Sequence, residues 1–116
     1  MPTAAYVRQT MLRLPGVEER FTWDSATFRV SGRIFALLNP SEESVTVKAS
    51  PAEQQALLAA DDTTFSSAPY TGRFGWVRVQ LASVDPDHLS ELLVEAWRRS
   101  APKLVTAGYS LKEVQS

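Results

Sequence analysis

Two strongly marked helix starts divide the chain and set the order of its elements. Ser50 precedes Pro51, with Glu53 completing a capping box, and Asp85 precedes Pro86. In both places an oxygen-bearing side chain can cap the helix, and proline occupies the first helical position, where its missing N–H does no harm. The segments that follow these caps are therefore predicted to be helical, and whatever lies before and between them must supply the rest of the fold.

The remaining helix boundaries follow from apolar spacing and from prolines. An N-terminal helix is expected from Ala4 to about Leu14, capped by Thr3 and stopped by Pro15-Gly16. The second helix is expected to run to about residue 60, and Pro102 is expected to end or kink the third. The third helix carries a full apolar stripe at Leu89, Leu92, Leu93, Ala96 and Trp97. Trp97 is accordingly assigned to the core.

Short runs rich in aromatic and β-branched residues predict the strands. In chain order they span residues 21–23, 26–30, 33–38, 44–48, 65–68 and 74–81, with Ser31-Gly32 as a hairpin turn. Grouped strands with helices at the margins indicate the α+β class. We expect a two-layer sandwich with the helices on one face of a mostly antiparallel sheet, in the order α-β(3-4)-α-β(2)-α. At 116 residues the chain is expected to form a single domain, residues 1–116.

Composition removes several classes of function. The chain has no cysteine and one histidine, which excludes disulfides, thiolate metal sites and zinc sites built from several histidines. His88, near the start of a capped helix, is expected to have a surface role. We therefore expect no enzyme activity, no cofactor and no metal. The chain shows no secretory signal and no apolar run long enough for a membrane, so a cytoplasmic protein is the default expectation.

Strand alternation predicts which side chains face away from the helices. In the 74–81 strand, Val77, Val79 and Leu81 share the inner face, and Phe74, Trp76, Arg78 and Gln80 share the outer one. The same alternation places Phe28, Val30, Val45 and Val47 inward and Arg29, Thr46 and Lys48 outward. The predicted outer surface thus combines basic and aromatic groups, with candidate binding residues Arg29, Arg33, Lys48, Arg73, Trp76 and Arg78.

This surface allows three interpretations. The arginines can simply be solvated or paired with acids across the strands. The same surface can instead bind DNA, with the basic residues contacting phosphates and Trp76 stacking on bases. It can also be a protein-interaction or homodimer surface, since tryptophan and arginine are enriched at such interfaces. DNA binding is the leading functional hypothesis, and a protein partner or homodimer is the alternative.

Several segments together resemble one known family. Residues 14–19 (Leu-Pro-Gly-Val-Glu-Glu), residues 28–38 and residues 48–53 look like the first half of an MmcQ/YjbR-like protein. Residues 70–77 (Tyr-Thr-Gly-Arg-Phe-Gly-Trp-Val) and 85–93, followed by Ala96-Trp97-Arg98, continue the resemblance. It covers about residues 4 to 103, and its specificity lies in the order and spacing of these segments.

The resemblance implies a fold similar to the CyaY-like and secretion-chaperone-like two-layer sandwiches. That expectation agrees with the element order derived above. Members of the family are commonly labelled DNA-binding proteins, which adds to the leading hypothesis. The resemblance brings no catalytic residue and no cofactor.

Overall fold

The computed structural model describes residues 2–22, 25–39, 41, 43–69, 71–103 and 105–106. The described residues form three α-helices, six strands and one 3-10 turn in the predicted order. In sequence they are α1 (Ala4–Leu12), β1 (Val17–Thr22), β2 (Ser25–Val30), β3 (Arg33–Leu38), β4 (Ser44–Val47), α2 (Pro51–Ala60), β5 (Phe65–Ser67), η1 (Thr71–Phe74), β6 (Val77–Gln80) and α3 (Pro86–Ser100).

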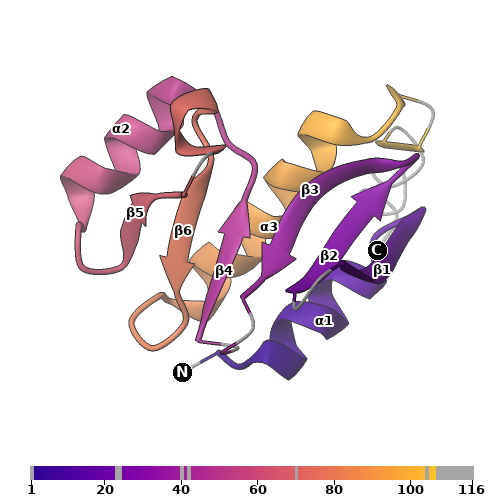
Figure 1. Cartoon of the computed structure of the whole chain (residues 1–116), viewed down its shortest axis with the longest axis horizontal. Helices are drawn as coiled ribbons and strands as arrows, with labels where there is room; N and C mark the ends of the chain where they lie inside the picture. The colour runs from indigo at the N-terminus through magenta and orange to yellow at the C-terminus, as the bar shows by residue number, and fades with distance from the viewer. Residues whose placement is uncertain are drawn as a thin grey trace.

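The strands form one open sheet in the order β1-β2-β3-β4-β6-β5, and every neighbouring pair is antiparallel. Figure 1 looks onto this sheet with α3 behind it and α2 beside β5 at one margin. The α+β expectation, with an antiparallel sheet and the order α-β4-α-β2-α, is confirmed. Among the described residues, no helix is long and apolar enough to cross a bilayer.

All three predicted helix caps are present. The Thr3 hydroxyl accepts a hydrogen bond from the Tyr6 amide at 3.2 Å, and the Ser50 hydroxyl accepts one from the Glu53 amide at 3.1 Å. The Asp85 carboxylate accepts one from the amide of His88 at 3.1 Å. Each cap satisfies a donor that the first helical turn leaves without a partner.

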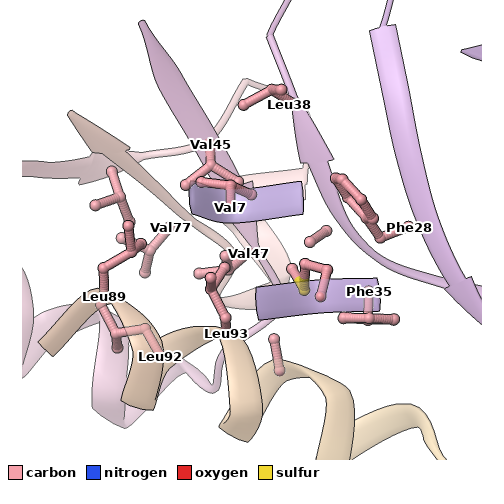
Figure 2. Close-up of a cluster of buried hydrophobic side chains, with 14 of the residues drawn as sticks. Val7, Phe28, Phe35, Leu38, Val45, Val47, Val77, Leu89, Leu92 and Leu93 are labelled. Carbon is pink, nitrogen blue, oxygen red and sulfur yellow. The ribbon is translucent and has the colours of Figure 1, made fainter. Parts of the chain in front are cut away.

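The core fills the space between the sheet and the helices behind it. Figure 2 shows Phe28, Val45, Val47 and Val77 from the strands meeting Val7 of α1 and Leu89, Leu92 and Leu93 of α3. The predicted inward residues of β2, β4 and β6 are all buried. Trp97 is fully buried as predicted, and its indole N–H donates a hydrogen bond to the carbonyl of Pro15 at 3.0 Å.

A β-bulge interrupts the pairing of β2 with β3. Phe28 pairs with Ala36 and Arg29 pairs with Ile34, so Phe35 has no partner in β2. Both Phe35 and Ala36 are fully buried. The extra residue lets two consecutive side chains enter the core while Arg29 keeps its outward position.

The predicted 74–81 strand is shorter than expected. Residues 71–74 form η1, and β6 begins only at Val77. Gly75 has φ +97°, and a side chain there would collide with the backbone of Ser50 and Pro51. A run of aromatic and β-branched residues therefore begins with a tight turn against the start of α2, and Phe74 does not belong to the strand face.

The start of the first strand also differs from the prediction. β1 begins at Val17, although its expected start was Phe21. Trp23, which the prediction included in this strand, lies outside the described residues.

Candidate nucleic-acid interface

The face of the sheet away from α1 and α3 carries polar and long side chains. Across the strands, one row of paired residues reads Arg20, Thr27, Leu37, Thr46, Arg78 and Ser66. Next to this row, Arg29 lies opposite Glu18 on β1 and opposite Ile34 on β3. We call this surface the open face. It includes Arg29 and Arg78, as the sequence predicted.

Small hydroxyl side chains of the open face are nevertheless buried. Thr27 and Thr46 are each 4% exposed, and Ser44 is 1% exposed. Ser44 accepts a hydrogen bond from the Arg78 Nε at 3.2 Å, and Thr27 accepts a longer one from the Arg29 Nε at 3.4 Å. The arginine stems lie along the sheet and cover the small residues.

The antiparallel order gathers most of the candidate residues at one end of the sheet. The β2–β3 turn, the last residues of β4 and the first residues of β6 lie at the same end, because alternate strands run in opposite directions. We call it the basic end. It brings together Arg29, Arg33, Lys48, Arg73 and Trp76, which span 48 positions of the sequence (29 to 76, counted inclusively).

Two exposed groups mark the β6 side of the basic end. The Arg73 guanidinium carbon lies 4.7 Å from the centre of the Phe74 ring, a cation–π arrangement. Phe74 is 59% exposed, unusual for a large apolar side chain. The sequence prediction placed Phe74 on a strand face and did not include it among the candidate residues.

The backbone around Trp76 is held by a buried glutamine. The Gln54 side-chain amide donates to the Gly72 carbonyl at 2.8 Å and to the Trp76 carbonyl at 2.9 Å. Gln54 is a buried residue of α2, so the helix fixes both ends of the turn that precedes β6. Trp76 itself is partly exposed.

Two predicted residues point elsewhere than expected. Lys48 was predicted on the outer face, but its ammonium group lies 3.3 Å from the Ser100 hydroxyl of α3, on the helix side. β4 ends at Val47, so strand alternation no longer decides where Lys48 points. Arg78 lies on the open face, but its contact with Ser44 directs it away from the basic end.

Further cations at the basic end were missed by the sequence reasoning. Arg98 and Arg99 occupy the last turn of α3, the turn that contains Ser100, the residue that Lys48 contacts. Arg99 forms an ion pair with Glu53 in the first turn of α2. Basic residues at helix C-termini and acidic ones at N-termini are stabilised by the helix dipole, and that preference was the available signal.

Acidic residues collect at the opposite end of the sheet, which we call the acidic end. There lie the start of β4, the loop before β5 and the start of α3, with Glu43, Asp61, Asp62, Asp85 and Asp87. The hydroxyl of Thr64 donates to the Asp61 carboxylate at 2.6 Å. This bond, together with bonds from the Thr64 and Thr63 amides, lowers the pKa of Asp61 below its ordinary value of 3.8.

The acidic end also holds a hollow of about 610 Å³ between the start of α1 and the end of β6. Glu43, Gln80 and Thr3 are among the residues that line it. It lies away from the candidate residues and was not predicted. Within the described ranges, no three His, Asp or Glu side chains gather closely enough to hold a metal ion.

The histidine differs from its predicted surface role. His88 is partly buried, and its ring meets the edge of the Phe65 ring at 5.5 Å between centroids. This contact joins α3 to β5, so His88 has a packing role.

Comparison with known proteins adds three findings. A family model described as YjbR matches residues 12–99. A solved structure, protein DR2400 of Deinococcus radiodurans with a domain described as DUF419, superposes with a TM-score of 0.76 at 23% identity, covering 84% of this chain and 77% of that one. No curated protein matches the chain.

Proposed function

The chain belongs to the YjbR family, and we propose that it is a small non-enzymatic domain that binds DNA through its basic end. The observation that carries the proposal is the separation of charge along the strands. The net charge is only -1, yet arginines and a lysine outnumber carboxylates at the basic end, where Glu18 lies opposite Arg29 and Glu53 pairs with Arg99. A second group of carboxylates lies at the acidic end. The proposal assigns the chain no catalytic step and no cofactor.

Arg33 and Arg73 are the best placed for phosphate contact. Both are exposed: Arg33 begins β3 and Arg73 lies in η1, on either side of the end of β4. The guanidinium group presents several donors in a plane and pairs well with phosphate oxygens. Arg29 lies one residue pair inside the sheet on the open face, whereas Arg33, opposite Val30, lies on the helix side of the same end.

Phe74 and Trp76 supply apolar rings beside these cations. Phe74 is exposed and Trp76 partly exposed. Aromatic rings next to basic groups are typical of surfaces that stack bases of unpaired strands while holding the backbone electrostatically. The proposal therefore favours single-stranded or locally opened DNA over an intact duplex.

The test is a fluorescence-anisotropy titration of labelled DNA, single-stranded and duplex, in low salt. Binding should be detectable below about 100 μM protein and should weaken steeply as salt rises, since each neutralised phosphate releases counterions. Replacing Arg33 or Arg73 with alanine should lower the salt slope by about one unit each. No complex with either DNA at that concentration in low salt would overturn the proposal.

A matched control separates the site from net charge. Asp62 is exposed at the acidic end, and the double variant R33A/D62N has the same net charge as the natural chain. It should bind DNA as weakly as R33A does. If D62N restored the affinity, binding would depend on overall charge, and the assignment to the basic end would be wrong.

One observation favours the alternative, a protein partner at the same surface. Phe74 is more exposed than is usual for a large apolar side chain, and aromatic residues are enriched in protein interfaces. For a partner in place of DNA, replacing Phe74 with serine should weaken binding more than replacing Arg33, and salt should have little effect. With a protein partner in place of DNA, the anisotropy titration of labelled DNA should show no complex, which distinguishes the two functions.

A further inference from the structure

The two edge strands of the sheet are protected to different degrees. β5 has three residues, and α2 lies beside it. β1 has six residues, Val17–Thr22, and among the described residues it pairs with β2 alone. A long edge strand offers unpaired backbone groups to any strand that can lie beside it. β1 is thus the edge at which the sheet can be extended.

The side chains of β1 alternate in a self-complementary way. Glu18 and Arg20 lie on the open face, opposite Arg29 and Thr27. Val17, Glu19 and Phe21 lie on the helix side, opposite Val30, Phe28 and Ala26. When two such strands pair antiparallel about Glu19, each Glu18 lies opposite the Arg20 of the other copy. Opposite charges directly across a strand pair are stabilising.

We propose that two copies of this chain associate through antiparallel pairing of their β1 strands, with Glu18 of each opposite Arg20 of the other. The two-fold axis passes through the sheet at Glu19, so the two six-stranded sheets join into one. Such an interface uses the same patch on both copies and closes on itself. This inference concerns the edge of the sheet and does not depend on DNA binding.

Phe21 gives this pairing an apolar component. It is 73% exposed, the most exposed of the large apolar side chains among the described residues. In the proposed register it lies opposite Val17 of the second copy, a residue partly buried at the margin of the core. Association would therefore remove two phenylalanine rings from water.

The like-charged pair at the axis is compensated. Glu19 of each copy accepts a hydrogen bond from the Arg8 Nε at 3.0 Å, so its charge is already neutralised from α1. The Glu18–Arg20 ion pair within one strand opposes the proposed pairing only weakly. Both side chains are more than half exposed, and exposed ion pairs contribute little to stability. A shift of the register by two residues would place Arg20 opposite Arg20, which is unfavourable.

The pairing also determines how the ends of the two copies are placed. A two-fold axis perpendicular to the sheet reverses the strand direction in the second copy. The basic end of one copy then lies on the side of the acidic end of the other. Parallel alignment of the two copies would instead place like ends together.

The experiment is a charge exchange across the interface, measured by sedimentation equilibrium over a range of concentrations. E18R and R20E, each alone, should raise the Kd of the dimer at least tenfold, because each places two like charges opposite one another. The double variant E18R/R20E should return the Kd close to that of the natural chain. Both positions are exposed, and circular dichroism checks that each variant folds.

Four results would overturn the proposal. One is that the natural chain remains monomeric up to about 1 mM. A Kd of that size corresponds to an association free energy of only about 4 kcal/mol. Another is a dimer that survives both single changes, or that the double change fails to restore. The third is a dimer weakened by the matched charge reversal R33E, away from β1, as much as by R20E. A dimer weakened by replacement of Phe74 more than of Phe21 would place the contact on the other surface and would also contradict the proposal.

Discussion

The two faces of the sheet bury their residues by different means. On the helix side, Phe28 and Val47 are closed off by a second layer, the helices α1 and α3. On the open face, Thr27 and Thr46 are almost as buried, but long side chains of the same face cover them. A low exposed fraction therefore does not distinguish the core face of this sheet from the open face. The two faces differ in what covers the buried residues, which is a layer of helices on one side and long polar side chains on the other.

The largest expected effect tests this difference on neighbouring residues of β2. Phe28→Ala should destabilise the fold by about 3–5 kcal/mol, because a fully buried ring is removed from a packed layer. Thr27→Ala should cost about 1 kcal/mol, since it removes the hydrogen bond that the Thr27 hydroxyl donates to the Arg20 carbonyl. Urea denaturation measures both. Equal losses would mean that the open face is also a packed layer.

A smaller effect is expected where α2 holds the turn that precedes β6. Gln54→Ala should cost about 1–3 kcal/mol, because the Gly72 and Trp76 carbonyls each lose a donor. Hydrogen exchange should be faster at the amides of Gly75 and Trp76. The control is Gln55→Ala at an exposed neighbour, whose amide makes only a long contact of 3.5 Å with the Gln54 carbonyl oxygen, and it should change both quantities much less. Unchanged exchange in Gln54→Ala would show that η1 keeps its shape without α2.

The smallest effect lies at the acidic end, away from both faces. The Thr64 hydroxyl holds the pKa of Asp61 low, so the ionised carboxylate favours the folded state. That contribution is present above the pKa of the unfolded chain and is lost as pH falls through the lower folded pKa. Thr64→Val should therefore show a shallower loss of stability below about pH 4. Denaturation midpoints from pH 2 to 6 measure it, and an unchanged acid limb would contradict the assignment.

Much of the fold was predictable because local chemistry and packing agree. The caps at Ser50 and Asp85, the bounds of β3 and the inward residues of β6 all follow from side chains whose local preference matches their place in the fold. The start of β6 was not predictable in this way. Its aromatic residues favour a strand, but Gly75 must pass close to α2, a contact that only the folded chain reveals.

The candidate site was predicted by residue but not by arrangement. Strand alternation correctly turned Arg29 and Arg78 outward, and it failed at Lys48 because the strand had ended. Strand alternation predicts which face of the sheet a side chain lies on, but it does not predict which end of the sheet the side chain lies near. The concentration of cations at one end depends on strand direction and on the C-terminus of α3, neither of which a single strand's pattern contains.

The extra residue in β3 sets the phase of the hairpin that displays Arg29. β3 uses six residues where perfect pairing with its neighbour would need one fewer between Arg33 and Leu38. If all six residues paired regularly, without the bulge, Phe35 would lie opposite Arg29 on the open face and Ile34 opposite Val30 on the helix side, each on the other face from where it lies now. A design that transfers this hairpin to another sheet must keep the bulge, because the faces on which its arginines lie depend on it.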